Sequence, residues 1–285
     1  IMNLLDFPRK KSFGTSLILL SVSVMVVGVS ILGVTQECAT PTHTTQAQDA
    51  CEKQPLHLQQ VAHTQVRVET AKELGLVFQD HDYTLELTQG ESHLQVPRLE
   101  LVSLPGDLAK AGKDKKTLFL RTHLPLILKT NEQILQERER LMALVDMQEN
   151  GFPVRTRDKE WIRDLAKKYG MTKINITELK KRVDVIPPSL ALGQAVVESG
   201  WGVSPAARRG NSTFGMMRRS TNKVRSYDSL QECVSDYVRN LNSHPAYKSM
   251  RQIRASMRQE SDQICSLKLA DGLHQYSTRG QSYIR

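Results

Sequence analysis

From about residue 101 onward, apolar and polar residues recur with the period of an α-helix. Asn131 is placed to cap a helix that begins at Glu132 and carries an apolar stripe opposite a charged face. A second helix is expected from Asp158 to Tyr169, and Gly170 would end it. This part of the chain is therefore predicted to be mainly helical.

The stretch that follows Pro187 is apolar nearly all round. Because proline is tolerated in a first helical turn, we predict a helix over about 188–199. A helix without a polar face belongs in the core of a domain. Gln194 and Glu198 interrupt its apolar residues, and their spacing of four places them on one face. The helix is thus expected to present an amide and a carboxylate on the same side.

Shorter segments come after this helix. Ser204–Gly210 contains the cap, first-turn proline and terminal glycine of a short helix. Phe214–Tyr227 is turn-prone and indicates a small hairpin or an irregular lobe. Ser229 and Glu232 form the capping-box pattern of another helix, and a last helix is expected over about 260–275.

Before residue 101 the strongest signal is one long apolar run. Gly14–Val34 carries no charge, follows Arg9-Lys10-Lys11, and is long enough to cross a bilayer as a helix. We favour an uncleaved signal anchor over a cleaved signal peptide, because the run is long and the residues after it make a poor cleavage site. The basic flank would keep the N-terminus in the cytoplasm and place the rest outside.

These patterns divide the chain into three parts. Residues 1–35 are expected to be the transmembrane anchor, and residues 36–100 a linker with a weakly structured extension. Alternation around Tyr83–Leu87 allows a short strand or hairpin in that extension. Residues 101–285 are expected to form the folded domain.

Charge and cysteine content narrow the choice of partners. The 285-residue chain has a net charge of +9, which favours nucleic acid, acidic membrane surfaces or acidic wall polymers. No Lys/Arg-rich helix is interleaved with aromatic residues, so we do not expect nucleic-acid binding. The cysteines lack metal-ligand spacing, and no metal or other cofactor is expected. Proximity along the chain would pair Cys38 with Cys51 and Cys233 with Cys265, although free buried thiols are an alternative for the second pair.

Glu198 is placed unusually for a carboxylate. It falls in the last turn of an apolar helix, where the helix dipole and desolvation both disfavour the anion and would raise its pKa. A raised pKa suits a general acid that works near neutral pH. A glutamate that points into solvent is the alternative. Gly200 and Gly202 favour the first interpretation, because they let the chain present Trp201 beside the acid, as in many sugar-binding sites.

The segment QAVVESGWGVSPAARRGNSTFGM resembles the glucosaminidase signature of glycoside hydrolase family 73, and most closely its Bax-type bacterial members. Further similar motifs run in order through about residues 100–285. The resemblance implies a lysozyme-like, mainly α (α+β) domain with a small β-lobe, and hydrolysis of the β-1,4 bond after N-acetylglucosamine in peptidoglycan. Glu198 would be the catalytic acid, and Tyr276 would help to position substrate. The matching positions around the groove are Gln194, Trp201, Asn211 and Phe214, although Asn211 could equally be a turn former and Phe214 a core residue.

One expected feature is missing from the sequence. Glycoside hydrolysis usually needs two carboxylates, yet Met216–Ser226 contains neither Asp nor Glu. The substrate's acetamido group could assist with Tyr276, Asp228 could substitute, or the protein could be weak or inactive. A lytic transglycosylase and a membrane-tethered protein that only binds peptidoglycan are the competing functions. The anchor would hold the domain in the periplasm at the bacterial inner membrane, or release it if cleaved.

Overall fold

A computed structural model defines the fold. It describes residues 57–58, 63–86, 94–218, 220–221, 223–261 and 263–273. These residues belong to one compact unit within Ile31–Arg285. The predicted membrane segment 14–34 and Tyr276 lie outside the described residues. Within the described ranges, no helix combines the length and apolar character needed to cross a membrane.

The described chain is mainly helical, as predicted. Its α-helices are α1 (Ala71–Asp80), α2 (Asp114–Glu149), α3 (Thr156–Lys168), α4 (Ile176–Arg182), α5 (Pro188–Ser199), α6 (Pro205–Gly210), α7 (Leu230–Ser243), α8 (Lys248–Glu260) and α9 (Ser266–Ala270). Short 3-10 turns are η1 (Leu108–Lys110), η2 (Pro245–Tyr247) and η3 (Asp271–Leu273). The strands are β1 (His57–Leu58), β2 (Thr64–Val66), β3 (Gln95–Val96) and β4 (Leu99–Leu101).

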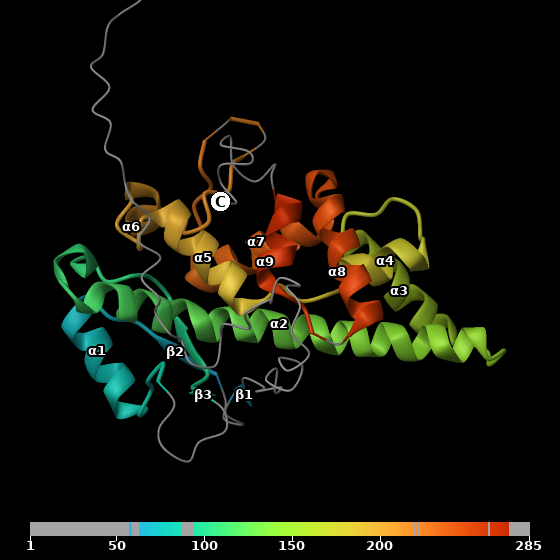
Figure 1. Cartoon of the computed structure of the whole chain (residues 1–285), viewed down its shortest axis with the longest axis horizontal. Helices are drawn as coiled ribbons and strands as arrows, with labels where there is room; N and C mark the ends of the chain where they lie inside the picture. Colours follow the sequence, from blue (N-terminus) through green and yellow to red (C-terminus); the bar gives the residue numbers. More distant parts are fainter. Residues whose placement is uncertain are drawn as a thin grey trace, which may run out of the picture. The chain divides into compact units, whose positions relative to one another are not determined.

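The 36-residue helix α2 is the element on which the others are assembled. Figure 1 shows α5 and α7 lying along one side of it, and both helices contact it directly. Leu124, Leu126 and Ile127 in its first half are fully buried. The N-terminal half of α2 is therefore a core helix, and it provides the floor beneath α5 and α7.

The start of α2 differs from the prediction. Asn131 does not cap a helix at Glu132, because the helix begins at Asp114 and Asn131 lies in its interior. The Asn131 side chain donates to the Ile186 carbonyl oxygen at 2.8 Å and accepts from the Ile186 amide at 3.2 Å. This buried side chain ties α2 to the segment before α5, a long-range role that local capping patterns do not reveal.

The segment before α2 is more ordered than the weak sequence pattern suggested. β1 pairs in parallel with β3, and β2 in parallel with β4, while Thr70 caps α1 through a capping box. The expected strand around 83–87 is wrong at its described residues, because 83–86 are in no strand. Tyr83 instead packs edge-on against Phe78, with ring centroids 5.4 Å apart. A domain boundary near residue 100 stays a prediction, although β4 contacts α2 directly.

The C-terminal part contains one helix that the sequence did not predict. α8 is mostly polar, but Arg251 and Arg254 on it are almost wholly buried. The helix expected over 260–275 is shorter, because α9 starts at Ser266 and passes into η3. Backbone packing is very close there: a Cβ on Gly272 would lie 2.4 Å from the Met250 Cα.

An ionic network explains how α8 buries its arginines. Asp184, before α5, is 3% exposed and lies 2.9 Å from Arg258 and 3.8 Å from Arg254. Burial raises the pKa of the Asp184 carboxyl, but the neighbouring arginines outweigh burial and hold it below its ordinary value. Arg254 also donates to the Asp184 and Val185 carbonyl oxygens. The charges are therefore both paired and hydrogen-bonded, as buried charges need to be.

The cysteine pairing predicted from proximity is wrong for the second pair. Cys233 is a free, buried thiol on α7, whereas Cys265 forms a disulfide. Cys233 lies on the buried face of α7, so the alternative of a free buried thiol is confirmed for Cys233 and wrong for Cys265. The predicted pairing of Cys38 with Cys51 falls on residues outside the described ranges.

Candidate active site

The C-terminus of α5 carries the predicted catalytic acid. The helix spans Pro188–Ser199 as expected, and Glu198 is half-buried in its last turn. Gly200, Trp201 and Gly202 follow with φ angles of 58°, 64° and 77°. Glycine adopts these left-handed angles readily, whereas Trp201 is strained by them. The chain therefore turns away sharply just after the acid.

Hydrogen bonds and close packing fix this turn. The Ser199 hydroxyl donates to the Ala195 carbonyl oxygen at 2.6 Å and accepts from the Gly202 amide at 2.8 Å. A Cβ on Gly202 would lie 2.7 Å from Leu104 and 2.9 Å from Phe119. Because no side chain fits at Gly202, the turn sits directly on α2 and on the loop before it. Glu198 thus projects from a rigid helix end.

The lobe that begins at Phe214 meets the acid from the other side. Gly215 has a φ angle of 62°, and a Cβ there would lie 2.8 Å from the Glu198 Oε2. Phe214 is 1% exposed and stacks on Tyr237 of α7, with ring centroids 4.0 Å apart. Phe214 therefore anchors the lobe, and Gly215 provides the close approach to the carboxylate.

The rest of the lobe forms the small hairpin that the sequence allowed. Met217 and Val224 make an antiparallel bridge, and the Arg225 amide donates to the Met216 carbonyl oxygen at 2.7 Å. Its described residues carry no carboxylate, in agreement with the sequence. The lobe is therefore a support for the acid and a wall of the site.

A cleft of about 400 Å³ opens in front of Glu198. Glu198 lines it from α5, and Phe214–Met217 and Arg225 line it from the lobe. The opposite wall comes from the C-terminal half of α7 and from the turn His244–Tyr247. The cleft thus places one carboxylate at the junction of a helix end and a hairpin.

Two of the predicted groove residues lie away from this cleft. The ring of Trp201 packs edge-on against Phe119 at 6.1 Å, with the Lys116 ammonium 5.2 Å from the ring centroid. Asn211 has a φ angle of 51° and donates to the Tyr227 carbonyl oxygen at 3.2 Å, so it ends α6 as a turn former. Neither is among the described residues that line the cleft.

The other two predicted residues lie at or below the cleft floor. Gln194 is 4% exposed, and its amide oxygen accepts a hydrogen bond from the Tyr237 hydroxyl. Since Tyr237 supports the Phe214 ring, Gln194 contributes to the site from underneath. Phe214 lines the cleft while remaining almost wholly buried.

A buried polar chain supports the same floor. Burial lowers the pKa of His123 on α2 to about 4, so the ring is neutral at physiological pH. Its Nδ1 lies 2.9 Å from the Phe119 carbonyl oxygen, which can only accept, so Nδ1 carries the proton. Nε2 therefore accepts from the Thr213 hydroxyl at 3.2 Å. The residue before Phe214 is held in place by α2.

The sequence reading missed a second carboxylate in the cleft. Asp236 on α7 accepts from Arg225 at 2.6 Å, from the Tyr227 hydroxyl at 2.8 Å and from Arg239 at 2.9 Å. Burial raises the pKa of this carboxyl, but these hydrogen bonds and charges outweigh burial and hold it below its ordinary value. Asp236 is therefore ionised and fully engaged. An i,i+3 spacing to Arg239 was its only local signal.

Tyr247 was also missed, although it faces the acid. Burial raises the pKa of its phenol. A hydrogen bond with Asn240 lowers this pKa and the negative charge of Glu198 raises it, but the net shift is upward. The phenol is consequently protonated at neutral pH. Asp228, by contrast, does not line the cleft, and its backbone amide donates to the Glu232 carboxylate.

Comparison with known proteins assigns this part of the chain to a family. Residues 173–281 match the family model described as mannosyl-glycoprotein endo-beta-N-acetylglucosaminidase, and this range includes every described residue that lines the cleft. The chain is 40% identical over 198 residues to Protein bax of Escherichia coli (strain K12), which covers 64% of the chain and 70% of that relative. The chain belongs to the Bax-type glucosaminidase family. No solved structure matches it significantly.

The match to a glucosaminidase domain indicates a glycosidase related to peptidoglycan. Among the described residues, no group of His, Cys, Asp and Glu is arranged to hold a metal ion. Because the matched range starts at 173, α1, the strand pairs and α2 lie outside the match to the family model. In this Bax-type chain, however, α2 supplies the floor on which Glu198 and Phe214 rest.

Proposed function

We propose that the protein hydrolyses the β-1,4 bond after N-acetylglucosamine in peptidoglycan, with Glu198 as general acid on a lysozyme-like helical scaffold. The observation that carries the proposal is the contact between Glu198 and the lobe. The half-buried carboxylate lines a cleft, and it lies so close to Gly215 that no side chain fits at position 215. An acid held this closely by rigid elements suits proton transfer to a positioned glycosidic oxygen.

The reaction needs a second group in addition to the acid. Glu198 would donate its proton to the leaving oxygen as the bond to the anomeric carbon breaks. In the substrate-assisted route, the acetamido oxygen forms a transient bond to that carbon. Water then attacks the anomeric carbon, breaks this transient bond and gives its proton to the Glu198 carboxylate, which restores the acid. Tyr276, which lies outside the described residues, stays our candidate for orienting the acetamido group.

Asp236 is a less suitable nucleophile or base than its position suggests. Three hydrogen bonds occupy its oxygens, and its lowered pKa makes it a weak proton acceptor. It can still stabilise positive charge that develops on the sugar. We therefore prefer substrate assistance to a route through Asp236 or Asp228.

Two variants test the roles of the carboxylates. In a dye-release assay on purified peptidoglycan, Glu198→Gln should lower activity at least about 100-fold, as expected for loss of a general acid. Asp228→Asn should retain activity within about twofold, because Asp228 does not line the cleft. Full activity of Glu198→Gln would refute the assignment. A large loss in Asp228→Asn with an intact fold would refute substrate assistance.

The alternative functions predict different outcomes. A lytic transglycosylase on the same scaffold would leave anhydromuramic ends, and a protein that only binds peptidoglycan would release no soluble sugar. The absence of carboxylates from the described part of the lobe is the observation that favours the second alternative.

We further propose that residues 14–34 anchor the protein in the inner membrane with the glucosaminidase domain in the periplasm. The support is the long uncharged run behind a basic flank. Protease added to spheroplasts should then degrade the domain, while protease outside intact cells should not. Resistance to protease in spheroplasts, with degradation after lysis, would contradict this location.

A further inference from the structure

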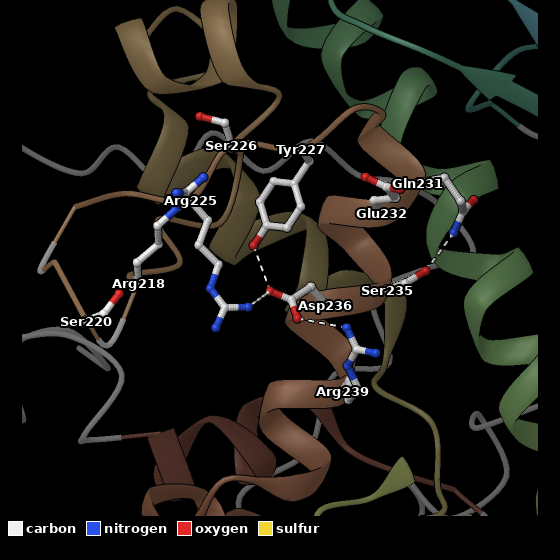
Figure 2. A pocket seen from close by; sticks show the side chains of 10 residues that line it. All are labelled: Arg218, Ser220, Arg225, Ser226, Tyr227, Gln231, Glu232, Ser235, Asp236 and Arg239. Atoms are coloured by element: carbon white, nitrogen blue, oxygen red, sulfur yellow. Dashed lines mark hydrogen bonds and ion pairs between the residues drawn. The ribbon is translucent and has the colours of Figure 1, made fainter.

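A second cavity, of about 770 Å³, adjoins the cleft on the other side of the lobe. Arg225, Asp236 and Arg239 line both spaces, so the two border each other at these residues. Figure 2 shows Arg225 and Tyr227 pointing toward Asp236 from the lobe, and Arg239 reaching it from α7. A ligand in the cleft therefore lies beside residues that also line this second cavity.

The second cavity has an excess of positive charge. Its lining includes three arginines, Arg218, Arg225 and Arg239, against the two carboxylates of Asp236 and Glu232. Glu232 is occupied at the helix end, where it accepts from the Asp228 amide at 3.0 Å. Arg225 and Arg239 lie on the boundary that the cavity shares with the cleft, whereas Arg218 lines the cavity alone.

The arginines retain hydrogen-bond donors for a ligand. Arg225 uses Nη1 on Asp236 and Nε on the Met217 carbonyl oxygen, and Arg239 uses Nη2 on Asp236. A guanidinium has five N–H donors, so each keeps several that no described residue accepts. Their side chains are 36% and 54% exposed. Arg218 is exposed and makes no ion pair within the described part of the chain.

Asp236 holds Arg225 and Arg239 in a fixed geometry. It is 11% exposed at its side chain and holds one guanidinium on each of its oxygens. Because the guanidinium is planar, a second anion on the open edges of Arg225 and Arg239 would be met by donors that are already oriented. Asp236 is thus a positioning residue for an anion site.

We propose that Arg218, Arg225 and Arg239 bind carboxylates of the peptide stem that peptidoglycan carries beside the cleaved bond. This inference rests on the proposed function, because it takes peptidoglycan as the strand in the cleft. A stem branches from the sugar next to the N-acetylglucosamine and ends in carboxylates, which guanidinium groups bind in pairs of hydrogen bonds. The site then selects stem-bearing strands over neutral polymers of N-acetylglucosamine.

Binding by the full-length Glu198→Gln chain, which does not consume its ligand, tests the proposal by titration calorimetry. The three probes are a disaccharide tetrapeptide, the same disaccharide stripped to its lactyl carboxylate, and neutral chitotetraose. Arg218→Gln should weaken binding of the tetrapeptide probe about threefold, typical of an exposed charge contact. Arg218→Gln with Arg225→Gln should weaken it about tenfold. Added salt should weaken it as well.

The other measurements serve as controls. Arg209→Gln is the matched control, because Arg209 on α6 is exposed, makes no ion pair among the described residues and does not line the cavity. It should leave the affinity for every probe unchanged, and chitotetraose should not respond to any arginine variant. Thermal unfolding of each variant measures whether the fold is intact, above all in Arg225→Gln.

The outcomes separate this proposal from the proposed function. Equal losses for all three probes, or no loss in Arg218→Gln, would overturn the stem site. A loss for the stripped disaccharide as large as for the tetrapeptide would assign the arginines to the lactyl carboxylate instead and overturn the proposal. If stem-dependent binding is lost in the variants while the wild-type chain releases no sugar, the stem site is supported and the hydrolase function fails.

Discussion

At the scale of single residues, Glu198 leaves no space for a side chain at Gly215. The Cβ of any other residue would lie 2.8 Å from the Glu198 Oε2, at a φ angle of 62° that disfavours L side chains. Either the carboxylate or the lobe would have to move. The position of the acid is therefore set jointly by the end of α5 and the start of the lobe.

Gly215→Ala tests this joint positioning. We expect a loss of activity on the order of 100-fold, since a displacement of about 1 Å at a catalytic group has that effect. The backbone strain should lower the free energy of unfolding by only about 1 kcal/mol. Peptidoglycan hydrolysis and urea unfolding of the variant measure the two effects.

Gly151→Ala is the matched control for this experiment. Gly151 has a φ angle of 79°, but a Cβ there would meet nothing within 4 Å. It should reproduce the strain without the loss of activity. Wild-type activity in Gly215→Ala, or an equal loss in both variants, would contradict the positioning role.

At the residue level, the sequence correctly predicted the position of Glu198 in the last turn of α5, whereas its catalytic role stays a prediction. Glu198 was identified from its place in an apolar helix and from the motif around it. Asp236 and Tyr247 were not, because their relation to the cleft depends on contacts with the lobe and with Glu198. Asn211 matched a groove position in the motif, but its left-handed conformation accounts for an asparagine at this position without a sugar contact.

At the scale of elements, helices with clear terminal signals were predicted closely. Pro188 starts α5, and Ser204 caps α6 by accepting from the Ala207 amide. α8 was missed because its sequence is mostly polar and gives no sign of burial. Arg251 and Arg254 are nevertheless buried, through long-range partners. Local sequence cannot show that a charged residue has a buried partner.

The packing of α8 on η3 yields a prediction about stability. Gly272→Ala would place a Cβ 2.4 Å from the Met250 Cα, so the two backbones must separate. We expect a loss of about 3 kcal/mol or more in the free energy of unfolding, in the range of severe overpacking. Chemical denaturation of the full-length chain measures it.

Gly193→Ala should change the free energy of unfolding in the opposite direction. Gly193 is exposed within α5, and a Cβ there would meet nothing within 4 Å. Alanine should raise the free energy of unfolding by about 0.5–1 kcal/mol, because it favours the helix. If Gly272→Ala were as stable as Gly193→Ala, the close approach of η3 to α8 would be wrong.

At the scale of the whole molecule, the described elements are connected through α2 and the Asp184 network. Asp184 links the segment before α5 to Arg138 on α2 and to Arg254 and Arg258 on α8. Because the pKa of Asp184 is lowered in the folded state, its contribution to stability is present above its unfolded pKa of about 3.9 and is lost as pH falls through the folded value.

The network predicts both a pH dependence and a mutant effect. The free energy of unfolding should decline below about pH 4 in the wild type. Asp184→Asn should cost about 3–5 kcal/mol near neutral pH, because it leaves buried Arg254 without its carboxylate, and the acid decline should be shallower. Urea unfolding as a function of pH measures both. Identical slopes in the two proteins would exclude Asp184 as a source of the acid sensitivity.

The central claim is that Glu198 donates the proton that releases N-acetylglucosamine ends from peptidoglycan. Mass spectrometry of the fragments released from purified peptidoglycan, for wild type and Glu198→Gln, tests it most directly. We predict reducing N-acetylglucosamine ends from the wild type and none above background from the variant. Anhydromuramic ends from the wild type, or N-acetylglucosamine ends from the variant at the wild-type rate, would contradict the claim.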